Sequence, residues 1–341
     1  MIFIIVLNCR IFDENFRMHT IAQYREYFTA YLSEKTNTKK PTNLYEPITY
    51  ILSLGGKRLR PVLVLMATEL FGTDFKKALD AALAIEVFHN FSLVHDDIMD
   101  DAPLRRGKET VHEKWDINTG ILSGDAMLIN AYQLFENYEG ETFRNLAKLF
   151  SKTAIEVCEG QQYDVDFETR DDVTQAEYLK MIEFKTAVLV AAALKMGGIV
   201  ANANLEDQNS VYEFGRNLGI AFQLQDDYLD AFGDPKTFGK QVGGDIIENK
   251  KTYLYLKAKE LGAAQQQKEL IDMFSIRPDD SSSKIARIKE LFKETGAAEE
   301  TQKAIAVYTA KAFEVLEKLD VSADKKAVLK KFGNGLMVRR V

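Results

Sequence analysis

The sequence predicts an almost wholly helical protein, and three observations support this prediction. Proline is scarce, with only 6 in 341 residues. Alanine, leucine, lysine and glutamate are abundant, whereas runs of alternating β-branched residues are few. The hydrophobic content of 46% is normal for a globular protein with a sizeable core. The length allows either one large domain or two ordinary ones.

Charge, cysteine content and hydropathy argue against several classes of protein. The net charge of -7 argues against nucleic acid as a main partner, because phosphate binding needs a basic face. The two cysteines, Cys9 and Cys158, give no disulfide framework and fit a reducing compartment. No apolar run reaches the roughly 20 residues that cross a bilayer, so stable membrane insertion is not expected.

The chain begins with a short apolar run that becomes polar at Asn8. This run lacks the basic start and the small-residue cleavage site of a signal peptide. We hypothesise that residues 1–17 are an extension upstream of a natural start at Met18, which the intact mass of the natively expressed protein tests. An amphipathic helix is predicted over residues 20–33, followed by a polar loop through Pro41.

A second helix is predicted over residues 44–54, and Gly55-Gly56 break it. Lys57 and Arg60 follow, one helical turn apart, just before an apolar helix over residues 62–71. Two cations beside the outward-pointing amide groups of a helix start form a good seat for a diphosphate. Taken alone, the segment could equally be a solvated basic turn.

Two acidic pentads organise the sequence, each at the end of an apolar helix. The first closes a helix over residues 77–100 that is apolar nearly all round, as expected at the centre of a bundle. The second closes a helix over residues 209–232. The carboxylates are Asp96, Asp97 and Asp100 in the first pentad, and Asp226, Asp227 and Asp230 in the second.

Within each pentad the first and last carboxylates lie about 40° apart on a helical wheel. They repel one another unless a hard divalent cation accepts their oxygens. One such pentad could be a solvated surface cluster. Two of them, facing each other across a cleft, would form a Mg²⁺ cage for a polyanionic substrate.

Other polar residues accompany the pentads. His89 falls within about 20° of Asp96 on the wheel, so it shares the carboxylate face, although a lone buried histidine is usually a core residue. Arg105 and Arg106 follow the first pentad in a loop, where they can bind the phosphate oxygens that a metal leaves exposed. Gln223 lies on the flank of the second pentad.

Between the two pentads, helices are predicted over residues 118–137, interrupted at Gly124-Asp125, and over residues 141–156. The segment that starts at Gly160 then places Gln161 and Asp164 three residues apart. A polar loop over residues 168–174 precedes an apolar helix over residues 178–197, which Phe184-Lys185-Thr186 interrupt near its start. A cation and a hydroxyl inside an apolar helix favour a position facing a buried anion over a solvated surface.

A glycine-rich segment with Lys240 and Lys250 follows the second pentad, after a break at residues 233–235. It is not a P-loop, because the spacing and the preceding strand are missing. A flap that brings lysines over a metal-bound diphosphate and excludes water is the mechanistic alternative. Residues 257–341 are predicted to be helices of the scaffold with a polar loop over 277–283. Arg339-Arg340 could reach the active site or lie in solvent, and solvent is the default for a chain end.

Taken in order, these motifs resemble the trans-isoprenyl diphosphate synthases, the polyprenyl synthetase family, over roughly residues 44–260. The motifs are GGKRLRP, a first DDxxD followed by RRG, GQxxD, FKT, a second DDxxD, and a Gly-Lys loop that ends in Lys-Thr. The resemblance implies one catalytic domain over residues 18–341, an all-α bundle around a central cavity, and a cytoplasmic homodimer. The implied reaction is head-to-tail condensation of an allylic diphosphate with isopentenyl diphosphate.

The resemblance also implies a role for each motif residue. The seat for isopentenyl diphosphate would be Lys57, Arg60, His89 and Arg106. The six pentad aspartates would hold several Mg²⁺ ions, with Mn²⁺ as a substitute, on the allylic diphosphate. The same diphosphate would be bound by Arg105, Lys185 and Lys240, with Lys250 nearby. Thr186 and Gln223 would line the reacting carbons, and the released pyrophosphate would accept the proton.

Product length is implied by the residues before the first pentad. In the family, bulk at the position of Phe91 limits the product, and here Ser92 follows it and Phe88 precedes it. The first pentad also lacks a two-residue insertion typical of bacterial farnesyl synthases. This pattern resembles the geranylgeranyl type, with farnesyl close behind and a longer-chain product as an alternative. An ideal wheel, however, places Phe91 away from the carboxylate face.

Three competing functions are disfavoured by particular residues. A terpene cyclase usually replaces the second acidic motif, which is intact here. A non-catalytic partner subunit would be expected to have lost carboxylates or basic residues, and none is missing. A two-metal hydrolase does not fit the apolar surroundings, which would protect a carbocation from water.

Overall fold

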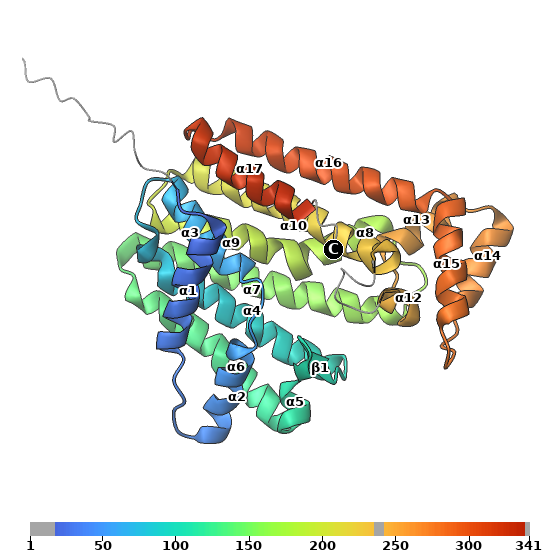
Figure 1. The fold of residues 1–341 in the computed structure, drawn as a ribbon, viewed down its shortest axis with the longest axis horizontal. Helices are drawn as coiled ribbons and strands as arrows, with labels where there is room; N and C mark the ends of the chain where they lie inside the picture. Colours follow the sequence, from blue (N-terminus) through green and yellow to red (C-terminus); the bar gives the residue numbers. More distant parts are fainter. Residues whose placement is uncertain (1–17, 235–241, 338–341) are drawn as a thin grey trace, which may run out of the picture.

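The structure, a computed structural model, describes residues 18–234 and 242–337. Within these ranges the chain is a bundle of helices (Figure 1), and its only strands form one small hairpin, β1 (Leu104–Arg105) and β2 (Lys108–Glu109). The predicted all-α fold is therefore confirmed. In the described part of the chain, no helix has both the length and the apolar character needed to cross a membrane.

The first helices are α1 (Ile21–Lys35), α2 (Thr42–Ser53), α3 (Leu59–Leu70), the 3₁₀ helix η1 (Phe75–Ala78) and α4 (Leu79–Met99). After the hairpin come α5 (Val111–Lys114), α6 (Ile117–Gln133), the 3₁₀ helix η2 (Leu134–Asn137), α7 (Gly140–Thr169) and α8 (Gln175–Ile182). They are followed by the π-helical turn η3 (Glu183–Ala187), α9 (Val188–Val200), α10 (Leu205–Phe232) and α12 (Gly244–Ile247). The chain continues with α13 (Tyr253–Leu261), α14 (Ala264–Met273), α15 (Ser282–Glu294), α16 (Ala297–Lys318) and α17 (Ala323–Met337).

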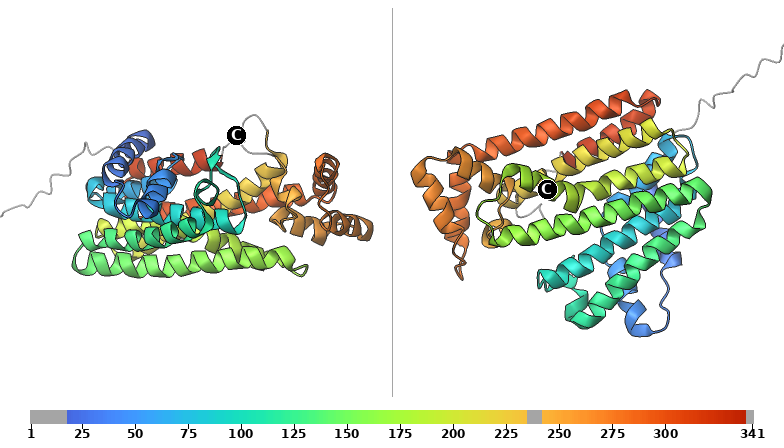
Figure 2. Two further views of the ribbon diagram at one scale, coloured as in Figure 1. Left: turned by 90° about the horizontal axis from the view of Figure 1, so that it is seen from below. Right: turned by 180° about the vertical axis from the view of Figure 1, so that it is seen from behind.

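The long helices pack side by side. Helix α9 packs against α3, α7 and α10, and α4 packs against α6. Figure 2 shows α10 running along α16. One core cluster joins α1 to α4 with α6, α9 and the first halves of α7 and α10. A second cluster joins α8 and the later part of α10 to α13, α15 and α16. The second acidic pentad therefore lies beside the second cluster.

Two glycines allow α7 and α10 to approach the π-helical turn closely. A Cβ atom at Gly160 of α7 would overlap the backbone of Lys185. A Cβ atom at Gly219 of α10 would lie 2.7 Å from the Cα of Ala187. The interruption predicted at residues 184–186 is confirmed as this π-helical turn, and the two glycines hold it between the two long helices.

One predicted helix end and one predicted interruption are wrong. The helix predicted over residues 141–156 continues to Thr169, so Gln161 and Asp164 lie on α7 itself. Helix α6 is not interrupted at Gly124-Asp125. Gly124 is instead a point of close contact, because a Cβ atom there would overlap the ring of His95 on α4.

Candidate active site

The first pentad occupies the last turn of α4, where Asp100 is the C-cap. Asp97 is 1% exposed, and its Oδ1 accepts a hydrogen bond of 2.9 Å from Nε of Arg105 and a second one from Nη2. Its Oδ2 is buried and has no hydrogen-bond partner among the described residues. The strand β1 thus brings the predicted Arg105 back onto the pentad, and one buried carboxylate oxygen has no partner among the described residues.

Burial disfavours the ionised form of these carboxylates. It raises the pKa of Asp96 to about 6, although Lys185 opposes the shift and Asp100 adds to it. It also raises the pKa of Asp97, against the hydrogen bond from Arg105. These carboxylates need more positive charge than the protein itself supplies, as expected for ligands of a divalent cation.

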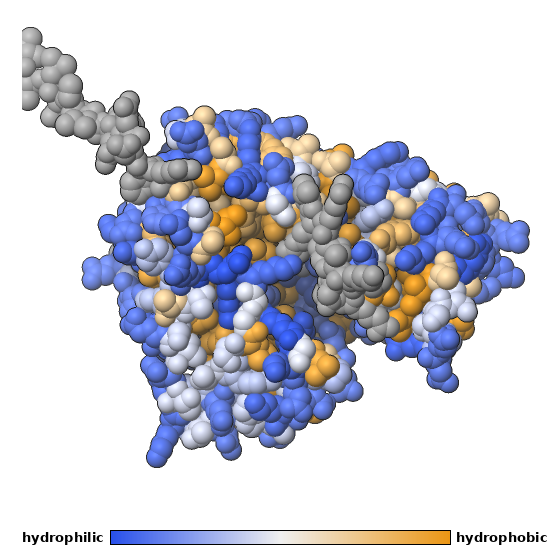
Figure 3. Space-filling view, viewed as in Figure 1, coloured by the Kyte–Doolittle hydropathy of each residue, from blue (hydrophilic) through white to orange (hydrophobic). Residues whose placement is uncertain are grey.

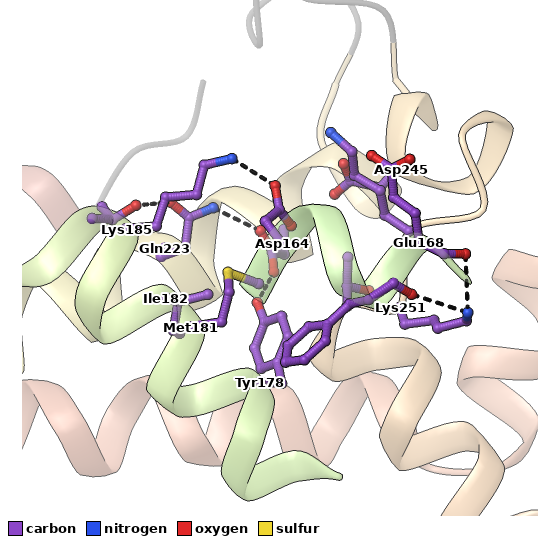
Figure 4. A pocket seen from close by; sticks show the side chains of 14 residues that line it. Asp164, Glu168, Tyr178, Met181, Ile182, Lys185, Gln223, Asp245 and Lys251 are labelled. Carbon is purple, nitrogen blue, oxygen red and sulfur yellow. Dashed lines mark hydrogen bonds and ion pairs between the residues drawn. The ribbon is translucent and has the colours of Figure 1, made fainter. Parts of the chain in front are cut away.

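The second pentad lies in the last turns of α10 and joins a hydrogen-bonded chain (Figure 4). Asp227 accepts hydrogen bonds from the hydroxyl of Tyr178 and, at 2.9 Å, from Nε2 of Gln223. Oε1 of Gln223 in turn accepts a hydrogen bond of 3.0 Å from the hydroxyl of Thr186. The structure therefore brings together three of the predicted site residues, Thr186, Gln223 and Asp227. Burial raises the pKa of Asp227 to about 6.

Lys185 projects from the π-helical turn and forms a 2.6 Å ion pair with Asp164 of α7. The prediction that Lys185 faces a buried anion stays a prediction. Its partner in the structure is the half-buried carboxylate of Asp164, which was not predicted as a site residue. The signal was present in the sequence as the GQxxD motif. Its glycine allows the contact, and its aspartate, one turn along α7, makes it.

Asp245 in α12 is a second residue that the sequence analysis missed. Its backbone N–H donates a hydrogen bond of 3.0 Å to Oδ2 of Asp230. Burial, and then the charges of Asp227 and Asp230, raise the pKa of its carboxyl group well above the usual value. Asp245 and Lys250 line one pocket together with Lys185 and Asp227 (Figure 4). Lys250 also pairs with Glu248 at 2.8 Å. Lys240 and Arg339-Arg340 lie outside the described residues.

Lys251 lines the same pocket, and its ammonium group binds backbone carbonyl oxygens. Its Nζ donates to the carbonyl oxygens of Phe167 at 3.1 Å and Glu168 at 3.3 Å, and to that of Arg170. These carbonyls belong to the C-terminal end of α7, where a cation is favourable. Lys251 thus fastens the segment after α12 to the helix that carries Asp164.

The predicted seat for isopentenyl diphosphate lies around the start of α3. Its four residues are Lys57, Arg60, His89 and Arg106. Nη1 of Arg60 is 3.1 Å from Nε2 of His89, and Nη1 of Arg106 donates to the carbonyl oxygen of Gly55. Burial, and then the neighbouring arginines, lower the pKa of His89 well below the usual value, so its imidazole is neutral. The expectation that Lys57 and Arg60 share a helical turn is wrong, because α3 begins at Leu59.

The residues predicted to limit product length lie on α4 among aromatic rings. The ring centroids of Phe88 and Phe91 are 5.4 Å apart, and Phe91 is 4.8 Å from the ring of His95. Phe88 also contacts Phe150 of α7 at 5.1 Å. Ser92 is half-buried and donates a hydrogen bond to the carbonyl oxygen of His89.

The pentad carboxylates fit a metal site that the substrate completes. Within the described ranges, the one group of three ligand atoms within 4.8 Å of one another is Asp101, His112 and Glu113, so the pentads do not form a closed cage by themselves. Mg²⁺ is usually held by one or two carboxylates together with substrate phosphates. The all-oxygen donor set and the unpartnered Oδ2 of Asp97 match this arrangement. Figure 3 shows that the face of the molecule turned toward the viewer in Figure 1 is hollowed near its centre.

The sequence profile of the polyprenyl synthetase family matches residues 41–294. The chain belongs to this family. It is 43% identical over 235 residues to the geranylgeranyl diphosphate synthase of Methanosarcina mazei, covering 68% of this chain and 72% of the relative. It is 40% identical over 280 residues to the geranylfarnesyl diphosphate synthase of Natronomonas pharaonis, covering 77% of this chain and 80% of the relative.

A crystal structure of a geranylgeranyl pyrophosphate synthase superposes with a TM-score of 0.90 at 54% identity, covering 95% of this chain and all of that one. The predicted family and the predicted class of short-chain prenyltransferase are confirmed. Enzymes of this family use divalent metal ions and isoprenoid diphosphates. The roles of single residues stay predictions.

Replacing Gly160 by alanine should destabilise this polyprenyl synthetase by about 1–3 kcal/mol, because the new methyl group would overlap the backbone of Lys185. A melting curve measures the loss. Gly335 in α17 is the matched control, since a Cβ atom there meets nothing within 4 Å and alanine favours helix. Equal melting temperatures for Gly160→Ala and Gly335→Ala would refute the close contact.

Proposed function

We propose that the protein makes geranylgeranyl diphosphate by adding isopentenyl diphosphate to an allylic diphosphate. The observation that carries this proposal is the π-helical turn with Lys185 and Thr186, which packs against α10. Thr186 is linked to Asp227 through Gln223, and the charge of Lys185 acts on Asp96. Such a site can hold a diphosphate between two sets of carboxylates.

The reaction breaks the allylic C–O bond and forms a C–C bond to isopentenyl diphosphate, after which a proton is lost to the pyrophosphate. When bound by the six pentad aspartates, divalent cations, which we propose to be Mg²⁺ with Mn²⁺ as a substitute, would neutralise the departing pyrophosphate. Arg105 and Lys185 would donate hydrogen bonds to the same group. Lys240 and Lys250 would act from the following segment.

The residues beside the reacting carbons have a different task. The pocket includes Met181, Ile182 and Tyr178, which give it an apolar wall without a strong nucleophile (Figure 4). The oxygen atoms of Thr186 and Gln223 would face the carbocation, where their dipoles are favourable. Lys57, Arg60, His89 and Arg106 would hold isopentenyl diphosphate so that its double bond reaches the cation.

One incubation tests this proposal. Radiolabelled isopentenyl diphosphate is mixed with Mg²⁺ and dimethylallyl, geranyl or farnesyl diphosphate, and the products are sized by chromatography. We expect label in a 20-carbon prenyl diphosphate. Label in longer chains would favour the longer-chain alternative, and no label with any primer would overturn the proposal and favour a partner-subunit role.

The Phe91→Ala variant should make longer products than the wild type. Phe91 is buried between the rings of Phe88 and His95, and truncating it leaves a space beside them. Ser92→Phe is the opposite change on the neighbouring residue, and it should shorten the product. Chromatography that shows unchanged products for both variants would remove these residues from the control of length.

We also propose a homodimer. Several apolar side chains of α6 and α7 are exposed in the single chain, which favours a covered face between two copies. They are Ile117, Ile121, Leu122 and Ile129 on α6, and Phe143, Ile155, Tyr163 and Val165 on α7. Light scattering should give twice the chain mass, and a monomer at working concentration would contradict the proposal. A cytoplasmic location stays a prediction.

A further inference from the structure

The diphosphate seat at the start of α3 contains one cation that cannot serve as a ligand. Arg58 lies between Lys57 and Arg60 in the sequence, but its side chain is only 6% exposed. Its guanidinium donates to the carboxylate of Glu86 on α4 and to the carbonyl oxygen of Leu52 at the end of α2. Arg58 therefore faces the interior while its neighbours belong to the predicted seat.

The backbone around Arg58 is held in an unfavourable conformation. Arg58 has a φ of 50°, in the left-handed region that residues with a Cβ atom rarely occupy, and Arg106 has a φ of 55°. Both residues adjoin the loop at Gly55-Gly56. Arg58 follows this loop in the sequence, and Arg106 donates a hydrogen bond to the carbonyl oxygen of Gly55. Such strain persists only where surrounding contacts fix it, and the Arg58–Glu86 ion pair is such a contact.

Glu86 connects this loop to the rest of the site. It is 2% exposed, and besides Arg58 it accepts a hydrogen bond of 3.2 Å from Nδ2 of Asn90 on the same helix. Helix α4 also carries His89, one turn after Glu86, and the first pentad about 10 Å farther along the axis. A single rigid helix thus holds both the anchor of the loop and the carboxylates.

We propose that Arg58 and Glu86 are positioning residues for isopentenyl diphosphate. Their buried ion pair fixes the positions of Lys57 and Arg60 relative to His89 and to the first pentad. The double bond of isopentenyl diphosphate is thereby held at the distance from the allylic carbon that the reaction requires. This inference rests on the proposed function. Bond formation between two bound substrates requires close control of their separation, whereas binding of the allylic diphosphate alone does not.

The experiment removes both charges together, in the variant R58M/E86L. Removing one partner alone would leave a buried charge uncompensated, whereas an apolar pair of similar size is often neutral for stability. We expect an unchanged melting temperature, a KM for isopentenyl diphosphate raised about tenfold, and an unchanged KM for the allylic diphosphate. The control is R287M/E269L, which removes an ion pair of 2.6 Å between α14 and α15.

A KM for isopentenyl diphosphate within twofold of the wild type would overturn the inference. A parallel rise of both KM values with a lower melting temperature would also overturn it, since that pattern marks a merely structural pair. If R58M/E86L does not fold, E86Q replaces it. This variant leaves Arg58 without its charged partner, so its melting temperature is expected to fall, and a KM for isopentenyl diphosphate that rises no more than the KM for the allylic diphosphate would overturn the inference. Failure of the wild type to incorporate any label would instead refute the proposed function, so the two failures are distinguishable.

Discussion

Replacing Asp96 by asparagine is expected to lower kcat by about a thousandfold, the loss that follows removal of a strong electrostatic stabiliser of a charged transition state. The melting temperature should stay the same or rise. Burial raises the pKa of Asp96 to about 6, so its ionised form is unfavourable in the metal-free protein, and asparagine removes that charge at nearly constant shape. Steady-state assays and melting curves measure the two effects.

A lower kcat together with an unchanged or higher melting temperature marks a carboxylate that binds metal, whereas loss of a structural carboxylate would lower the melting temperature. The matched control is Asp324→Asn, which removes an exposed carboxylate from α17 and should change neither quantity. An Asp96→Asn enzyme with more than a tenth of wild-type kcat would show that Asp96 is dispensable for ionisation. A fall in both activity and melting temperature would indicate a structural role.

The sequence predicted those features of the site that depend on residues close together in the chain, namely the two helix ends and the interruption near residue 185. The apolar periodicity of residues 77–100 and 209–232 places each pentad at the end of a helix, as the structure shows. The polar pair Lys185-Thr186 inside an apolar run predicts an interruption, and the interruption is a π-helical turn. These features follow from the order of neighbouring residues alone.

The partners of these residues could not be predicted, because they depend on contacts between distant helices. Lys185 pairs with Asp164 only because α7 continues past Glu156, where the predicted helix ended. Gly124 and Gly160 show the same ambiguity. A glycine can end a helix or admit a neighbouring element, and only the packed structure distinguishes the two.

Divalent cations should stabilise the protein strongly at high pH and weakly at low pH. Asp96 and Asp227 both have a pKa raised from 3.8 to about 6. Protonation of these groups therefore stabilises the folded protein below about pH 4, and this contribution is lost as the pH rises through about 6. At pH 8, Mg²⁺ at a hundred times its Kd should raise the melting temperature by about 4 °C.

Below pH 6 the same Mg²⁺ must displace protons from both carboxylates, so the rise in melting temperature should shrink toward zero at pH 5. The Asp96→Asn/Asp227→Asn double variant distinguishes this origin from general cation binding, because it should show neither the rise nor its pH dependence. An equal rise at pH 5 and pH 8 would place the cation elsewhere. The two acidic helix ends, separated in the sequence, would then not form one metal site.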